Sequence, residues 1–321
     1  MNYRRSVRMM AQGFGSRRRR LLVGALLLAL VMPMRGVVSA QSGAKTEAKI
    51  LTLGLISEIN RAAIEEHFLD FVRYVGRRLT PEVGGRVVVA STSFDLVKMI
   101  EQRQVDFYFE SVYSTYSINY VHGVGRTILR RWKSGLAEYQ SLLFTKKDGG
   151  VKRLDELRGK TIAFEDPGST SGYLMPKIFL QRNGFRLAEK KDYDANATPD
   201  QISYVFVPRE DKLLAMVLSK QAAAGAISDD SYGRLSNERK AEIAVLAQTE
   251  RLPRHLVSVR ADLAPQTVAR LTDILIAMHD DPEGLKILSR TDRTTKFDRL
   301  PGGEEALRKR LLESFYSADR K

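Results

Sequence analysis

The stretch Glu165-Asp166-Pro167-Gly168-Ser169-Thr170-Ser171-Gly172-Tyr173 decides how this chain is interpreted. The apolar run 160–164 before it predicts a strand, and residues 173–182 after it predict a helix. The first N–H groups of a helix have no partner within the helix, and the helix dipole places partial positive charge there. Three consecutive hydroxyl side chains add donors that can rotate toward a bound oxygen. The stretch therefore predicts an oxyanion site where the strand meets the helix.

A purely structural role for the same hydroxyls is the alternative. Ser and Thr most often stand before a helix because their side-chain oxygen accepts a hydrogen bond from a free backbone N–H group. Ser169 or Ser171 would then be an N-cap residue and would contact no ligand. The residues alone leave both interpretations open.

The longer segment from Leu154 to Pro176 resembles one found in the periplasmic phosphonate- and phosphite-binding proteins of ABC importers. In that family a leucine-rich lead ends in Gly-Lys, an apolar strand follows, and then come Asp-Pro, Ser-Thr-Ser-Gly and a further proline. The order of segments agrees from about residue 51 to residue 265. Hydroxyls and backbone amides of the family's Ser-Thr-Ser hold the anionic head group of the ligand. The resemblance implies this role for Ser169, Thr170 and Ser171.

Composition narrows the function further. The 321 residues carry a formal charge of +14, but residues 1–40 hold eight arginines and no acidic residue, so the remainder carries only +6. That remainder has no dense basic run, which argues against a nucleic-acid partner. Cysteine is absent, which excludes disulfides, thiolate metal sites and a lipid-modified cysteine.

The N-terminus predicts export. Arg17–Arg20 form a basic region, residues 21–31 are apolar, and Val38-Ser39-Ala40 supplies small residues before Gln41. We expect residues 1–40 to be a signal peptide, cleaved near Ala40, and the mature protein to be periplasmic. An uncleaved anchor is the alternative, and the secretion route stays open.

Apolar patterns predict an alternation of strands and helices along the mature chain. Strands are expected at 50–55, 86–90, 105–109, 127–130, 138–145, 161–164, 202–207, 222–228, 243–247 and 256–260. Helices are expected at 64–79, 96–100, 110–122, 173–182, 267–279, 282–289 and 304–315. Such an alternation is typical of α/β layers built on largely parallel sheets.

We therefore predict an α/β protein with the two-lobed periplasmic-binding-protein fold and a hinged ligand cleft. The polar, glycine-rich run 146–150 indicates a crossing between lobes. Lobe one is expected to comprise residues 48–145 plus 250–321, and lobe two residues 146–249. Ligands of such sheets bind beyond the carboxyl ends of the strands.

Two candidate residues follow strands of lobe one. The resemblance implies that Ser57 lies on a loop that enters the cleft and that Phe94 is part of an aromatic wall. An exposed loop serine and a core phenylalanine are the alternatives.

Two departures from the family pattern supply further candidates. Glu110 stands where the family has an aromatic residue and glycine, so it either faces the cleft or sits at a helix N-terminus, where a carboxylate is favourable. Arg209 replaces the family's histidine and could bind an oxyanion through two donors, or be an exposed arginine paired with a neighbouring acid. Ala223 stands where the family has an aspartate that contacts the aminoalkyl group of the ligand in phosphonate binders. This replacement argues against an aminoalkylphosphonate ligand.

Nothing in the sequence requires catalysis, a cofactor or a metal. The four histidines are far apart in sequence, and no phosphate-binding glycine loop is present. We predict a non-enzymatic, monomeric solute-binding protein that captures a phosphonate-, phosphite- or phosphate-like oxyanion for an ABC permease. The alternative is an extracytoplasmic sensing module for a histidine kinase or chemoreceptor. An exported hydrolase is a third reading, although no base is visible beside the serines.

Overall fold

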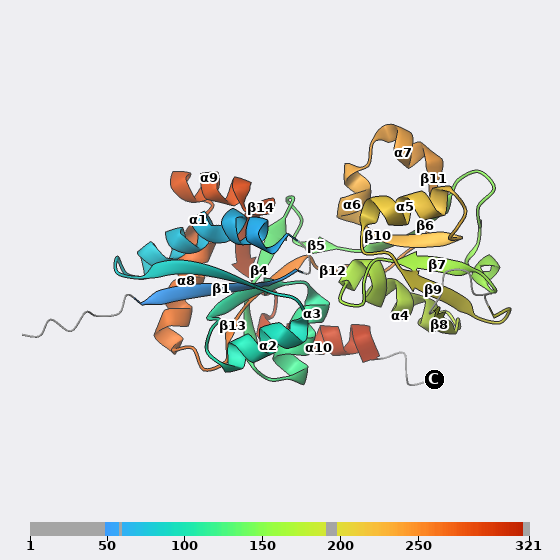
Figure 1. The fold of residues 1–321 in the computed structure, drawn as a ribbon. Helices are drawn as coiled ribbons and strands as arrows, with labels where there is room; N and C mark the ends of the chain where they lie inside the picture. The colour runs from blue at the N-terminus through green and yellow to red at the C-terminus, as the bar shows by residue number, and fades with distance from the viewer. Residues whose placement is uncertain (1–48, 58–59, 191–197, 317–321) are drawn as a thin grey trace, which may run out of the picture. The chain divides into compact units, whose positions relative to one another are not determined.

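A computed structural model describes residues 49–57, 60–190 and 198–316. The expected signal peptide and the cleavage point at Gln41 lie outside the described residues. Two six-stranded sheets with their helices, and a two-stranded sheet, make up the described chain (Figure 1).

The first sheet has the strand order β14-β4-β13-β3-β1-β2. β1 pairs in parallel with β2 and β3, whereas β13 is antiparallel to β3 and β4, and β14 is antiparallel to β4. The strands are β1 (Ile50–Ile56), β2 (Gly84–Ala90), β3 (Phe107–Glu110), β4 (Gly125–Lys133), β13 (His255–Arg260) and β14 (Thr294–Arg299).

Helices cover both faces of this sheet, because successive strand residues pack into different clusters. Phe107 and Phe109 join the core formed with α1, α8 and α9, whereas Tyr108 between them joins the core formed with α2. We call the first sheet and its helices lobe one. Its helices are α1 (Arg61–Leu79), α2 (Ser93–Glu101), α3 (Val112–Tyr116), the π-helix η1 (Ser117–Val121), α8 (Pro265–Ala277), α9 (Pro282–Arg290) and α10 (Gly303–Tyr316).

The second sheet has the order β11-β6-β10-β7-β9-β8. β10, β7, β9 and β8 run parallel, and β6 is antiparallel to β10 and β11. The carboxyl ends of β7, β9 and β10 therefore meet at one edge. The strands are β6 (Ser141–Lys146), β7 (Thr161–Phe164), β8 (Leu187–Glu189), β9 (Ile202–Phe206), β10 (Ala224–Ser228) and β11 (Ile243–Gln248).

This sheet is also covered on both faces. Phe164 of β7 packs with Leu180 of α4, whereas the adjacent Ala163 packs with Leu213 of α5. We call the second sheet and its helices lobe two. Its helices are the 3₁₀ helix η2 (Leu154–Leu157), the π-helix η3 (Thr170–Leu174), α4 (Met175–Arg182), α5 (Glu210–Leu218), α6 (Asp229–Arg234) and α7 (Asn237–Glu242).

The chain crosses between the sheets through two short strands that pair antiparallel, β5 (Glu138–Tyr139) and β12 (Leu252–Pro253). The first crossing lies earlier than predicted, because β6 (Ser141–Lys146) already belongs to the second sheet. The polar run 146–150 is thus the last residue of β6 and the turn after it, within lobe two, and its change of composition marks the exit from a buried strand. The expected return of the C-terminus to lobe one agrees with the packing of α10 against α3 and β4.

An apolar cluster joins elements of the two lobes next to the central stretch. Val112 and Tyr116 of α3 pack in it with Met175 and Ile178 of α4 and with Phe315 of α10. The cluster holds the start of α4, and with it η3, against α3. The residues that follow β7 therefore lie close to the residues that follow β3.

Several elements differ from the sequence prediction. The helix expected from residue 110 begins at Val112, because Glu110 is still the last residue of β3. It then passes into the π-helix η1, and the helix expected from residue 173 likewise begins as the π-helix η3. The strands β8 and β14 were not predicted, since Leu187–Glu189 is short and Thr294–Arg299 is largely polar.

Candidate functional site

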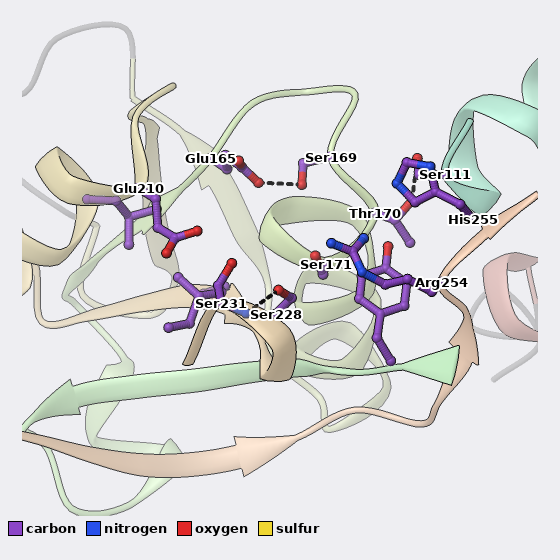
Figure 2. A pocket seen from close by; sticks show the side chains of 14 residues that line it. Ser111, Glu165, Ser169, Thr170, Ser171, Glu210, Ser228, Ser231, Arg254 and His255 are labelled. Atoms are coloured by element: carbon purple, nitrogen blue, oxygen red, sulfur yellow. Dashed lines mark hydrogen bonds between the residues drawn. The ribbon is translucent and has the colours of Figure 1, made fainter. Parts of the chain in front are cut away.

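A cavity of about 190 Å³ lies beyond the carboxyl ends of β7 and β10. Hydroxyl groups dominate its lining, so we call it the hydroxyl pocket (Figure 2). The residues that line it are Ser111, Tyr139, Glu165, Ser169, Thr170, Ser171, Glu210, Leu213, Ala226, Ile227, Ser228, Ser231, Arg254 and His255. The position agrees with the general rule that sheets with parallel strands bind ligands at this edge.

The loop after β7 is shaped by its own hydrogen bonds. Asp166 Oδ1 accepts the N–H of Gly168 at 2.8 Å, and the backbone of Glu165 donates to the carbonyl of Gly172 at 3.0 Å. Gly172 is required for this closure, because a Cβ there would lie 2.5 Å from Glu165 Oε2 and 2.9 Å from Ser169 Oγ. The glycine of the Ser-Thr-Ser-Gly motif thus lets the loop fold back onto its first residue.

Ser169 has both roles that its hydroxyl allows. Its oxygen accepts the N–H of Gly172 at 3.0 Å, which makes Ser169 the N-cap of η3. Its O–H donates to Glu165 Oε2 at 2.7 Å, as the dashed line in Figure 2 marks. Ser169 is therefore an N-cap residue, as the alternative interpretation of the sequence has it, and its side chain also lines the hydroxyl pocket.

Thr170 links the two lobes. Its hydroxyl donates to Ser111 Oγ at 3.0 Å (Figure 2). The same hydroxyl accepts the N–H of Tyr113 at 3.1 Å. Thr170 is 2% exposed, which is low for a residue at the wall of a pocket. Ser171, the third hydroxyl, lines the pocket beside Tyr139.

Two carboxylates and one guanidinium face this pocket. Burial raises the pKa of Glu165, although the hydrogen bond from Ser169 opposes the shift. Glu210, in the first turn of α5, also lines the pocket. Arg254 is the cation on the opposite wall, and burial lowers the pKa of His255 well below its ordinary value, so His255 is neutral at pH 7.

Arg254 is held in place by three contacts. Its guanidinium lies 4.5 Å from the centroid of the Tyr139 ring, and Nη2 lies 3.2 Å from Asp230 Oδ2. Its backbone N–H donates to the carbonyl of Ala137, next to β5. Within the part of the chain that the structure describes, Arg254 Nε is buried without a hydrogen-bond partner. A half-buried guanidinium with one unsatisfied nitrogen beside a hydroxyl cluster is suited to an anionic ligand.

A second cavity of about 570 Å³ lies in lobe one and shares His255 with the hydroxyl pocket. We call it the lobe-one cavity. Its lining residues are Leu55, Ile56, Ser57, Asn60, Ala63, Ile64, His67, Phe68, Phe109, Glu110, Arg131, Lys133, His255 and Asp292.

Charged groups form the floor of the lobe-one cavity. Arg131, 1% exposed, and Lys133 contact Asp292 Oδ2 at 3.1 Å and 2.7 Å. Burial raises the pKa of Glu110 from 4.5 to about 8, while Glu110 Oε1 accepts the N–H of Ile56 at 2.9 Å. Arg131 and Lys133 favour the ionised form of Glu110 but do not offset its burial.

The seven residues singled out from the sequence fall into three places. Ser169, Thr170 and Ser171 line the hydroxyl pocket, and Ser57 and Glu110 line the lobe-one cavity. Phe94 and Arg209 belong to neither lining.

Phe94 lies on α2, and 57% of its surface is exposed. Its ring contacts the ring of His122, and Lys98 Nζ lies 4.3 Å from the ring centroid. It therefore forms neither the expected wall of the cleft nor part of the core. Arg209 is exposed at the start of α5, where Nη2 lies 2.7 Å from Asp211 Oδ2. That pairing is the alternative that the sequence offered for Arg209.

Arg254, Tyr139, Ser228 and Ser231 were not predicted from the sequence. Tyr139 lies in the crossing strand β5, and Arg254 directly follows the crossing strand β12; the pairing of these strands depends on contacts across 113 residues of chain. Ser228 ends a predicted strand and Ser231 follows it, so the rule that sites lie at strand ends could have found them.

Metal binding and membrane spanning find no support in the described residues. No group of three or more His, Cys, Asp or Glu side chains there could hold a metal ion. None of the helices described is long and apolar enough to cross a membrane.

Comparison with known proteins assigns the family. Residues 53–300 match the model of a family described as "ABC transporter, phosphonate, periplasmic substrate-binding protein". The chain belongs to this family. Its members bind substrates for ABC transporter permeases, so this chain is a periplasmic binding protein and not an enzyme.

Solved structures agree with this family. XAC2383 from Xanthomonas citri bound to ATP is 25% identical, with a TM-score of 0.76 over 85% of this chain and 98% of that chain. The structure of the same protein bound to chloride ion is 26% identical in sequence, with a TM-score of 0.77 over 84% of this chain and 98% of that chain. PhnD1 from Prochlorococcus marinus (MIT 9301), in complex with methylphosphonate, is 18% identical, with a TM-score of 0.62 over 83% of this chain and 97% of that chain, and it shows the shared fold alone.

Proposed function

We propose that the hydroxyl pocket captures a small oxyanion of the phosphonate, phosphite or phosphate type for an ABC importer. The observation that carries this proposal is the convergence of Ser169, Thr170 and Ser171 with four other hydroxyl side chains and Arg254 on one cavity. Hydroxyl and guanidinium groups are the donors that hold tetrahedral oxyanions in proteins.

The pocket would bind such an anion by turning the hydroxyl groups of its lining toward the ligand. A hydroxyl hydrogen rotates at little cost, so Ser171, Ser228 and Ser231 can each present an O–H to a bound oxygen. Arg254 supplies the positive charge, and its unsatisfied Nε gains a partner when an anion arrives. We therefore assign to Arg254 the role that the sequence suggested for Arg209.

The lobe-one cavity would take the substituent of the ligand. It adjoins the hydroxyl pocket at His255, and apolar side chains such as Leu55 and Phe68 share its wall with polar ones. In this arrangement Ser57 and Glu110 contact the substituent and not the anionic head group. The anionic ligands of XAC2383, ATP and chloride ion, support an anion site in the relatives of this chain.

We propose that residues 1–40 are removed on export and that the mature, monomeric protein delivers its ligand to the permease in the inner membrane.

A thermal-shift screen of the mature protein tests the proposal. The panel comprises methylphosphonate, phosphite, phosphate, methanesulfonate and acetate. A ligand present at 100 times its dissociation constant stabilises the folded state by about 2.7 kcal/mol, which a melting curve resolves. We expect at least one phosphorus oxyanion to raise the melting temperature, and a panel without any shift would refute the proposal.

A further inference from the structure

We infer that Glu165 makes the hydroxyl pocket selective for head groups that carry a proton, such as a hydrogenphosphonate, over head groups without one, such as a sulfonate. The inference rests on the proposed function and names the class of oxyanion that the same site prefers. It is carried by the hydrogen bond from Ser169 to Glu165 and by the charges that face the pocket.

The first step concerns the hydrogen of Ser169. A serine hydroxyl has one hydrogen, and in this structure it is directed at Glu165 Oε2 at 2.7 Å. The oxygen of the same hydroxyl already accepts the N–H of Gly172. Ser169 can therefore donate to a bound anion only if it withdraws its hydrogen from Glu165.

The second step concerns what Glu165 then loses. Withdrawal leaves a partly buried carboxylate without that donor, and a buried acceptor without a donor is costly. A head group with a P–O–H group removes this cost, because its hydroxyl donates to Glu165 Oε2 while Ser169 donates to one of its anionic oxygens. Glu165 Oε2 then still accepts a hydrogen bond and Ser169 still donates one, as each does before binding. A sulfonate has no hydrogen to donate. Glu165 therefore either keeps the hydrogen bond from Ser169, which then cannot donate to the ligand, or is left without a donor.

The third step concerns charge. The groups that face Glu165 are Asp166 on its own loop, Glu210 at the start of α5, Arg254 on the opposite wall and the Ser169 hydroxyl. Two glutamates, Glu165 and Glu210, and one arginine, Arg254, line the pocket, and His255 adds no charge. A fully ionised dianion would be repelled by such a lining. A monoanion that retains a proton meets less repulsion and supplies the donor.

An ammonium group on the substituent could also donate to Glu165, and a set of four ligands separates the two sources. Methylphosphonate carries only the acidic proton, taurine only the ammonium group, 2-aminoethylphosphonate both and methanesulfonate neither. Titration calorimetry is performed at a pH below the second ionisation of both phosphonates, so that each carries its acidic proton. We expect both phosphonates to bind at least about 10-fold more tightly than both sulfonates. Equal binding of methylphosphonate and methanesulfonate would overturn the inference, and so would tight binding of taurine.

The variant Glu165→Gln assigns the selectivity to this residue. Its amide keeps an acceptor for Ser169 and adds a donor for the ligand, so the ratio of the two affinities should fall toward one. Glu210→Gln is the matched control, because it removes a charge from the same pocket without touching Ser169, and it should preserve most of the ratio. A ratio unchanged in Glu165→Gln, or lost equally in both variants, would overturn the role of Glu165. If none of the phosphorus oxyanions binds the wild type, the proposed function itself fails.

Discussion

Replacing Arg254 by alanine is predicted to weaken anion binding strongly while leaving the fold intact. The guanidinium is the cation of the hydroxyl pocket, and Nε has no partner among the described residues. A hydrogen bond to a charged group contributes about 1.5–3 kcal/mol. The dissociation constant of the bound oxyanion should therefore rise by about 10- to 150-fold.

The structure also bounds the cost in stability. Arg254→Ala removes a cation–π contact with Tyr139, which is worth about 0.5–2 kcal/mol. Asp230, the carboxylate partner of Arg254, keeps Arg234 at 2.5 Å, so no buried charge is left unpaired. We expect the free energy of unfolding to fall by on the order of 1–2 kcal/mol, which leaves a folded protein for titration.

Calorimetric titration with the anion that gives the largest thermal shift is the assay, and Arg209→Ala is the matched control. Arg209 is exposed and paired with Asp211, so its removal should leave affinity unchanged. Arg254→Lys should give an intermediate affinity, because lysine keeps the charge but not the planar pair of donors. Wild-type affinity in Arg254→Ala, or a loss confined to Arg209→Ala, would refute the placement of the cation.

Three further predictions concern the loop, the lobe-one cavity and the N-terminus. Gly172→Ala should destabilise the fold by about 1–3 kcal/mol in urea unfolding and weaken binding, since its Cβ meets Glu165 at 2.5 Å, whereas Gly168→Ala should be tolerated. Burial raises the pKa of Glu110, so the protonated form favours the folded state. Between pH 4.5 and about 8 the wild type should therefore lose stability relative to Glu110→Gln, by on the order of a few kcal/mol, and parallel pH curves would contradict this. N-terminal sequencing of exported protein should begin at Gln41, and an intact N-terminus would contradict cleavage.

Most of the fold could be predicted because its signals are local. The buried strand β7 was predicted at its observed bounds, and the helix α8 within two residues of them, from apolar periodicity alone. The first crossing was misplaced because composition changes wherever a strand leaves the core, whereas membership of a sheet depends on pairing with β10 and β11. The strand β14 was missed because its pairing with β4 orders a polar segment that has little strand signal of its own.

The candidate site could be predicted only in part, for a similar reason. Ser169, Thr170 and Ser171 are adjacent in sequence and carry a recognisable motif. Arg254 lies at the same pocket because it directly follows the crossing strand β12, and no local sequence pattern predicts the pairing of β12 with β5. Arg209 has an equally suggestive position in sequence, but Asp211, two residues away, satisfies it at the surface.

Calorimetric titration of the single variants Ser169→Ala, Thr170→Ala and Ser171→Ala tests the central claim most directly. If the three hydroxyls serve only as caps and lobe contacts, the variants lose about 1 kcal/mol of stability at most and bind the anion like the parent. If the hydroxyl pocket holds the head group, at least two of the three should bind about 10-fold or more weakly. Three variants that retain the parent's affinity would contradict the account.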